Sequence, residues 1–157
     1  MSQAPRRDIA FWIATGLGSG LAPKAPGTFG SLAALLPWLL LRELPWWAYA
    51  GITIAAFAIG CWACAALIRQ LGREDPGMAV IDEWVGMWIT LFAAPPEWWW
   101  APIGFALFRL FDIWKPWPVR WVDRGVHGGF GAMADDALAG VLGLLAMQVL
   151  VLLPAAG

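Results

Sequence analysis

The sequence predicts an all-α fold, a small polytopic bundle of about four to five apolar helices in a membrane. Hydrophobic residues make up 61% of the 157-residue chain and charged residues only 13%, about half the charged fraction of soluble domains. The apolar residues gather in segments separated by glycines, prolines and charges, and none alternates as a β-barrel strand would. The length fits a single domain, residues 1–157.

Five apolar segments account for the expected helices: 31–41, 46–68, 84–94, 98–110 and 137–153. A full membrane crossing needs about 20 residues, which only the second segment clearly reaches and the fifth approaches. The first and third segments have 11 residues each, or roughly 16 Å of helix. These two segments therefore either continue into their polar flanks or are sheltered half-spans whose ends lie below the membrane surface.

The positive charges predict the orientation in the membrane. If all five segments cross and the N-terminus is cytoplasmic, residues 1–30, 69–83 and 111–136 lie on the cytoplasmic side, together with Arg109 at a helix end. Nine of the ten lysines and arginines are then inside, and only Arg42 is outside, as the positive-inside rule expects. The sequence therefore predicts a multi-pass protein whose polar loops face the cytoplasm.

Two acidic pairs lie at the beginnings of apolar segments, where charge is costly to place. These pairs are Asp82–Glu83 and Asp135–Asp136. Gly86 and Gly140 follow at helical spacing, and two helices that pack through them would bring both pairs to one level. Four close carboxylates repel one another unless cations neutralise them, and oxygen ligands suit Mg²⁺ or Mn²⁺. The pattern favours a metal site over the alternative, which is simple helix capping.

Residues 16–31 form a glycine-rich polar segment, GLGSGLAPKAPGTFGS. Backbone amides freed by glycines can cradle a phosphate, and Lys24 would add a positive charge. The segment matches neither the Walker A pattern nor the dinucleotide-binding fingerprint. The alternative is a flexible entry loop in which Thr28 or Ser31 caps the next helix.

A basic and aromatic segment follows the fourth apolar segment. Arg109, Asp112 and Lys115 recur every three residues, so a helix would present them on one face until Pro116 ends it. The cations of this segment, Arg109, Lys115, Arg120 and Arg124, are candidates for a phosphate clamp. The alternative is an interfacial segment in which tryptophans lie among the lipid headgroups and the basic residues meet anionic lipid.

The chain has one histidine and two cysteines. His127 is a candidate general acid for a leaving alkoxide, or an ordinary loop residue. Cys61 and Cys64 form a C-x-x-C pattern inside an uncharged segment, with no further cysteine and no histidine nearby. We therefore expect buried free thiols rather than a redox or zinc site.

Four stretches together resemble the phosphatidylglycerophosphatase A family: GLGSGLAPKAPGTFGSLAA, DEWVGMWITL, FRLFDIWKPWPVRWVDR and GGFGAMADDALAG. Their length, order and spacing over residues 15–143 make the resemblance far more specific than one short motif. It implies a Mg²⁺-dependent phosphatase of a bacterial inner membrane. The implied reaction is hydrolysis of phosphatidylglycerophosphate to phosphatidylglycerol and inorganic phosphate.

Under this hypothesis the polar residues divide into three expected roles. The expected metal ligands are Asp82, Glu83, Asp135 and Asp136, for Mg²⁺ with Mn²⁺ as a substitute. The expected catalytic residues are Asp82, Glu83, Asp112, Asp136 and Lys115. The expected substrate-binding residues are Lys24, Thr28, Arg109, Arg120 and His127. Asp112 is either a further ligand or the general base, and the cations balance transition-state charge.

Other classes of function are weighed on the same residues. The sequence has neither a C-x₅-R loop nor a D-x-D-x-[TV] signature, so cysteinyl-phosphate and haloacid-dehalogenase chemistry are not expected. A net charge of −1 and the absence of a basic run argue against a nucleic-acid partner. A small transporter or a scaffold for anionic lipid is the non-enzymatic alternative. The sequence leaves the oligomeric state open.

Overall fold

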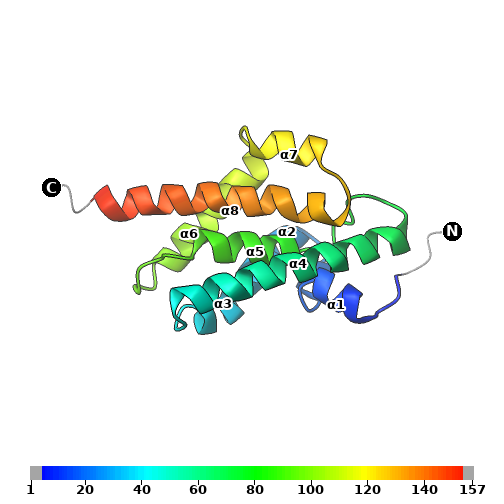
Figure 1. Cartoon of the computed structure of the whole chain (residues 1–157), viewed down its shortest axis with the longest axis horizontal. Coiled ribbons are helices and arrows are strands. Elements are labelled where there is room, and N and C mark those ends of the chain that lie inside the picture. Colours follow the sequence, from blue (N-terminus) through cyan, green and yellow to red (C-terminus); the bar gives the residue numbers. More distant parts are fainter. Residues whose placement is uncertain (1–4, 154–157) are drawn as a thin grey trace.

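The computed structural model describes residues 5–153, which form helices and connecting loops without a strand (Figure 1). The elements are α1 (Ile9–Ala14), the 3-10 helix η1 (Ser19–Leu21), α2 (Pro26–Ala33), α3 (Leu35–Leu41), α4 (Trp46–Leu71), α5 (Ile81–Thr90), α6 (Trp100–Trp114), α7 (Val119–Gly125) and α8 (Gly128–Leu152). The all-α prediction is therefore confirmed for these residues.

The long helices α4 and α8 run in opposite directions along the longest axis of the molecule (Figure 1). By length and composition these two can cross a membrane, with mean hydropathies of 2.1 and 1.7 in their most apolar windows. Large apolar side chains such as Ile54, Trp62, Leu145 and Val149 are exposed on them. This surface indicates association with a membrane. The finer prediction of a polytopic membrane bundle with about four to five apolar helices is not confirmed, because only α4 and α8 are long enough to cross, while α5 has 10 residues and α6 has 15.

The short helix α5 lies inside the bundle and packs most extensively against α8. A Cβ atom at Gly140 would lie 2.6 Å from the carbonyl oxygen of Gly86, and one at Gly86 would lie 2.8 Å from that of Asp136. The Oγ1 atom of Thr90 donates to the carbonyl oxygens of Gly86 and Gly140, at 3.0 and 3.2 Å. The predicted close packing through the two glycines is confirmed, and it brings the acidic pairs to one level.

Helix α8 begins nine residues earlier than the apolar segment 137–153 that predicted it. The glycines that precede Asp135 suggested a loop, but here they serve helix packing. A Cβ atom at Gly129 would clash with the carbonyl oxygen of Cys61 in α4, and one at Gly131 would clash with that of Val126. Asp135 and Asp136 therefore lie two turns inside α8, and helix capping does not explain this pair.

The glycine-rich segment over residues 16–31 does not use Thr28 or Ser31 as a helix cap, which was the alternative interpretation of its sequence. Helix α2 begins at Pro26 with Ala25 as its N-cap, and no side chain caps it. Thr28 lies within the first turn, while the hydroxyl of Ser31 donates to the carbonyl oxygen of Gly27 inside the helix. Neither Thr28 nor Ser31 is a cap, because proline is favoured in the first turn of a helix and moves the start upstream of both residues.

The helix that carries Arg109 and Asp112 ends close to the predicted stop at Pro116, but one residue before Lys115, which was predicted on the same helical face. Helix α6 stops at Trp114, and Lys115 takes a left-handed conformation with φ of 47° before Pro116. Two short helices, α1 and α7, were not predicted. Helix α1 packs on α4, and α7 packs on α8.

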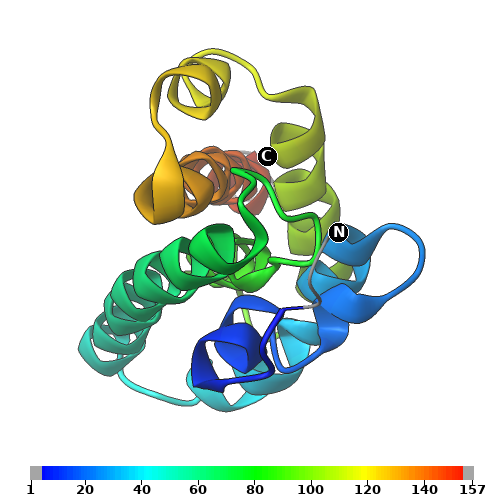
Figure 2. The ribbon, with the colours of Figure 1, turned by 90° about the vertical axis from the view of Figure 1, so that its right-hand side faces the viewer.

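The polar segments gather at one end of the molecule. Helix α4 ends there, α5 and α8 begin there, and the loop over residues 72–80 crosses between them (Figure 2). Exposed tryptophans lie at both ends of the bundle: Trp46, Trp47, Trp98 and Trp99 at the first turns of α4 and α6, and Trp114, Trp117 and Trp121 near the polar end. The polar cavity therefore lies at one end of an apolar helical bundle.

Candidate functional site

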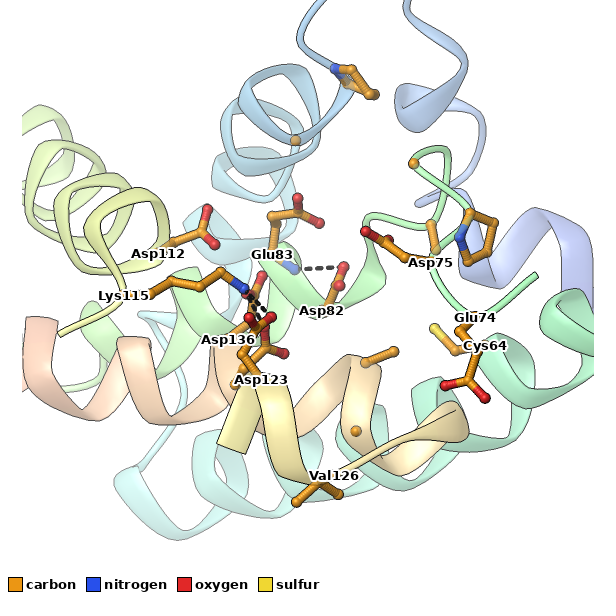
Figure 3. A pocket seen from close by; sticks show the side chains of 18 of the residues that line it. Cys64, Glu74, Asp75, Asp82, Glu83, Asp112, Lys115, Asp123, Val126 and Asp136 are labelled. Carbon is orange, nitrogen blue, oxygen red and sulfur yellow. Dashed lines mark hydrogen bonds and ion pairs between the residues drawn. The ribbon is translucent and has the colours of Figure 1, made fainter. Parts of the chain in front are cut away.

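A cavity of about 550 Å³ opens at the polar end (Figure 3). Its walls come from the start of α2, the loop over residues 74–77, the start of α5, the end of α6, and α7 with the first turns of α8. The acidic lining residues are Glu74, Asp75, Asp82, Glu83, Asp112, Asp123, Asp135 and Asp136, and the permanently cationic ones are Arg109 and Lys115. Acidic side chains outnumber the two cationic ones by six, so the cavity favours added cations over anions.

Three of these carboxylates form a compact cluster at the inner end of the cavity. Asp82, Glu83 and Asp136 each offer one ligand oxygen, and these oxygens all lie within 4.8 Å of one another. The side chain of Asp136 is almost fully buried, and the backbone N–H of Glu83 donates to Oδ1 of Asp82 at 3.0 Å. Burial raises the pKa of Asp82 well above its usual value, and the neighbouring charge of Glu83 raises it further.

The residues of this three-acid cluster fit a divalent cation. The Oε2 atom of Glu83 is buried and has no hydrogen-bond partner within residues 5–153. A buried carboxylate oxygen without a partner is costly, and a bound cation would supply the missing interaction. The donors are all oxygens and come from α5 and α8, which the glycine contacts hold at a fixed separation. Hard cations such as Mg²⁺ prefer such donors.

A second group of charges lies beside the cluster, between α6 and α2. The NH1 atom of Arg109 donates to Oδ2 of Asp112 and lies 4.0 Å from Oε1 of Glu83. Gly27, in the first turn of α2, sits so close to Glu83 and Arg109 that a side chain there would clash with them. Arg109 is thus a partly buried positioning residue that connects Asp112 to the cluster.

A third group contains the lysine. The Nζ atom of Lys115 donates to Asp123 and to Asp135, each at 2.6 Å. Burial opposes the charged lysine, but these two hydrogen bonds outweigh it and raise the pKa of Lys115. Burial likewise opposes ionisation of Asp123, and the bond from Lys115 outweighs it and lowers the pKa of Asp123. Asp135, one of the four expected metal ligands, is therefore paired with a lysine and lies outside the three-acid cluster.

Replacing Lys115 by methionine is expected to lower the free energy of unfolding by about 2 kcal/mol, because the buried carboxylate of Asp135 loses its cation. Thermal unfolding in detergent measures this loss. The Asp123→Asn change, at a carboxylate that is 40% exposed, should cost less.

The pH dependence of the Lys115 effect follows from the two pKa shifts. Because the pKa of Lys115 is raised in the folded protein, the charged lysine contributes fully to the free energy of unfolding below its ordinary pKa of 10.5. This contribution is lost only as the pH rises past the pKa of Lys115 in the folded protein. Because the pKa of Asp123 is lowered in the folded protein, its carboxylate stabilises the fold above its ordinary pKa of 3.8. This stabilisation is lost as the pH falls through the pKa of Asp123 in the folded protein. The part of the difference between wild type and Lys115→Met that comes from the Lys115–Asp123 bond should be constant from about pH 5 to pH 9. A difference that vanished near neutral pH would contradict these shifts.

The remaining candidates lie at the rim or outside the cavity. His127 lines the rim, and its Nδ1 atom lies 3.4 Å from Oε2 of Glu74, with both side chains about two-thirds exposed. Lys24 is exposed and Thr28 is half-buried, and neither lines the cavity, although Ala25, Pro26 and Gly27 do. Arg120 lines a separate groove with Trp117. The substrate-binding roles of Lys24, Thr28 and Arg120 stay predictions.

Two acids of the cavity were missed in the sequence. Glu74 and Asp75 lie in the loop between α4 and α5, and Figure 3 shows Asp75 beside Asp82. The signal available was the charged run Arg73-Glu-Asp just ahead of the third apolar segment. Such a run usually marks a solvated loop, so only the folded arrangement brings these acids to the site.

The two cysteines are free, as expected. Cys64 is fully buried in α4 and lies at the floor of the cavity, while Cys61 is half-buried one turn earlier. The C-x-x-C pattern here reflects two successive turns of a packed helix.

The sequence was compared with known proteins. A family model described as phosphatidylglycerophosphatase A matches residues 12–151. Phosphatidylglycerophosphatase A of Escherichia coli (strain K12) is 50% identical over 131 residues, which cover 83% of this chain and 76% of the relative. Phosphatidylglycerophosphatase A of Haemophilus influenzae (strain ATCC 51907 / DSM 11121 / KW20 / Rd) is 43% identical, covering 85% of this chain and 83% of the relative.

A third relative carries a different name. A putative phosphatidylinositol-3-phosphatase of Bacteroides thetaiotaomicron (strain ATCC 29148 / DSM 2079 / JCM 5827 / CCUG 10774 / NCTC 10582 / VPI-5482 / E50) is 44% identical, covering 87% of this chain and 90% of the relative. No solved structure gives a significant match.

Proposed function

The chain belongs to the phosphatidylglycerophosphatase A family, and we propose that it hydrolyses the terminal phosphomonoester of phosphatidylglycerophosphate to phosphatidylglycerol and inorganic phosphate. The observation that carries the proposal is the three-acid cluster of Asp82, Glu83 and Asp136, at the inner end of a polar cavity in an otherwise apolar bundle. Membrane helices rarely contain such a cluster without a functional role.

We further propose that the reaction depends on Mg²⁺, with Mn²⁺ as a substitute. Asp82, Glu83 and Asp136 would hold the ion. When bound, Mg²⁺ neutralises phosphoryl oxygens and lowers the pKa of a water molecule, which is the chemistry that phosphomonoester hydrolysis needs. The partnerless Oε2 atom of Glu83 and the excess of six acidic side chains in the cavity support this assignment. A dianionic phosphate would not enter such a cavity without added cations.

The other charged side chains of the cavity take supporting roles. Asp112 faces the cavity outside the three-acid cluster, and we assign to its carboxylate the proton of the attacking water. Arg109 orients Asp112 through its hydrogen bond and adds positive charge beside Glu83. Lys115, which Asp123 and Asp135 hold in place, would balance negative charge on the phosphoryl group in the transition state. His127, at the rim, is the proposed general acid for the glycerol oxygen.

We propose a multi-pass arrangement in a bacterial inner membrane, with the cavity facing the cytoplasm. Helices α4 and α8 would cross the bilayer, and the shorter α5 and α6 would be sheltered beside them. Nine of the ten lysines and arginines lie in the segments assigned to the cytoplasmic side, which supports this orientation through the positive-inside rule. The acyl chains of the substrate would then remain in the bilayer while the phosphomonoester enters the cavity.

Phosphate release from phosphatidylglycerophosphate by detergent-purified protein tests this function. We expect release with Mg²⁺ and a loss of at least about a hundredfold in excess EDTA, with recovery when Mg²⁺ is restored in excess. Release that continues unchanged in EDTA would contradict the metal proposal. No release from folded, monodisperse protein would contradict the phosphatase proposal, and ion flux in sealed vesicles without phosphate release would favour a transporter.

A comparison of substrates belongs in the same assay, because one relative is named a putative phosphatidylinositol-3-phosphatase. Phosphatidylinositol 3-phosphate carries the same terminal group on a bulkier ring. The proposed substrate should be the better one by its kcat/KM.

A further inference from the structure

Helix α7 has two faces that meet different surroundings. On its inner side Val119 is buried in the core, and Asp123 accepts the hydrogen bond from Lys115 at the edge of the reaction cavity. Its outer side and the residues just before it line a separate groove of about 380 Å³. The residues of this groove, hereafter the α7 groove, are Trp117, Arg120, Trp121, Arg124 and Gly125. Figure 2 shows α7 at the rim of the molecule, beside α8.

The charge of the α7 groove is positive and unneutralised. Neither Arg120 nor Arg124 forms an ion pair within residues 5–153, and the one hydrogen bond found for their side chains runs from Arg120 to the carbonyl oxygen of Trp114 at 3.5 Å. The single acid of α7, Asp123, is turned to the other side and held by Lys115. No carboxylate lines the groove. The reaction cavity, by contrast, has an excess of six acids, so the two sites attract opposite charges.

The aromatic side chains of the α7 groove indicate a lipid surface. Trp117 is 82% exposed and Trp121 is 68% exposed. Indole rings that have an apolar body and an N–H donor are favoured at the headgroup level of a bilayer, where both parts find partners. A guanidinium presents donors in a planar fork that matches the oxygens of a phosphate group. Two arginines one helical turn apart, flanked by two such rings, therefore suit a phospholipid headgroup.

We propose that the α7 groove binds the phosphodiester headgroup of an anionic bilayer phospholipid, at a site separate from the reaction cavity. The phosphate lies between Arg120 and Arg124, and Trp117 and Trp121 flank its glycerol and upper acyl region. Phosphatidylglycerol has a phosphodiester and no terminal phosphomonoester, which makes it a ligand for this groove and a poor one for the acidic cavity.

The test measures bound lipid and not enzymatic turnover. Its result therefore does not depend on whether the proposed phosphatase reaction is correct. Full-length protein in detergent is titrated with phosphatidylglycerol or with zwitterionic phosphatidylcholine, and retained lipids are counted by native mass spectrometry. We expect wild type to retain phosphatidylglycerol preferentially. Arg120→Gln with Arg124→Gln should weaken that retention roughly thirtyfold, because each basic residue near an anionic lipid surface contributes about fivefold.

A matched double variant removes the same charge elsewhere at the polar end. Arg69 and Arg73 are exposed, lie outside both the cavity and the groove, and have no ion pair among the described residues. Arg69→Gln with Arg73→Gln should leave retention near wild type. Trp117→Leu with Trp121→Leu keeps both arginines and should weaken retention by a smaller factor. All variants change exposed side chains, and size-exclusion chromatography checks that each stays folded and monodisperse.

Two results would overturn the proposal. Equal retention by wild type and by the Arg120/Arg124 double variant would show that the groove binds no anionic headgroup. Equal losses in the Arg120/Arg124 and Arg69/Arg73 variants would show that net charge, and not the groove, attracts the lipid.

Discussion

Asp136→Asn is expected to lower kcat for phosphate release at least about a thousandfold while the protein still folds. Asp136 supplies the only ligand of the three-acid cluster that comes from α8, and it is almost fully buried. Asparagine has nearly the same shape, so the packing of α5 on α8 should remain. Phosphate release with saturating Mg²⁺, together with size-exclusion chromatography, measures both effects.

Thermal unfolding separates the loss of a ligand from a loss of structure. Without divalent cations, Asp136→Asn should unfold at a higher temperature than wild type, because one of three crowded negative charges is gone. Adding Mg²⁺ should raise the unfolding temperature of wild type far more than that of the variant, since a ligand stabilises only the state that binds it.

Asp123→Asn is the matched control for Asp136→Asn. It makes the same chemical change in the same cavity, but at a carboxylate outside the three-acid cluster. It should retain the Mg²⁺-induced shift and lose less than about tenfold in kcat. Near-normal turnover by Asp136→Asn, or an undiminished shift with Mg²⁺, would contradict its role as a ligand.

The site could be predicted from the sequence where local spacing decides the geometry. Asp82 and Gly86 are four residues apart in α5, as are Asp136 and Gly140 in α8, so helical periodicity alone placed each acid on the face of its glycine. The face of α6 that carries Arg109 and Asp112 followed from the same rule, and a proline marked its end. These features depend on spacing within one helix, or on glycines that let the backbones of two helices come close together.

The features of the fold and of the site that the sequence did not reveal depend on contacts between segments far apart in the chain. The start of α8 was placed too late, because the close approach of Gly129 to Cys61 in α4 is a long-range contact that local spacing does not reveal. Asp135, expected as a fourth metal ligand, points about 100° away from Asp136, as adjacent helical positions do, and Lys115, in the turn that follows α6, pairs with it. No spacing rule within the sequence reveals that a lysine twenty residues upstream will take one acid of a pair and leave the other.

Gly140→Leu is expected to lower the free energy of unfolding by about 3 kcal/mol or more, and to abolish Mg²⁺-dependent stabilisation as well. A Cβ atom at Gly140 would already lie 2.6 Å from the backbone oxygen of Gly86, and a backbone cannot move aside as a flexible side chain can. The α5 and α8 helices must therefore separate. Their separation breaks the hydrogen bond from Thr90 to Gly140 and moves Asp136 away from Asp82 and Glu83.

Gly51→Leu is the matched control for Gly140→Leu, because a Cβ atom at Gly51 in α4 meets no atom within 4 Å. It should unfold like wild type and keep the Mg²⁺-induced shift. An unchanged unfolding temperature for Gly140→Leu would show that α5 and α8 do not rely on this contact. Asp136→Asn should lose the ion and keep the fold, whereas Gly140→Leu should lose both. That difference is what we expect if the glycine contact between α5 and α8 is the frame that holds the carboxylates at the spacing a single cation needs.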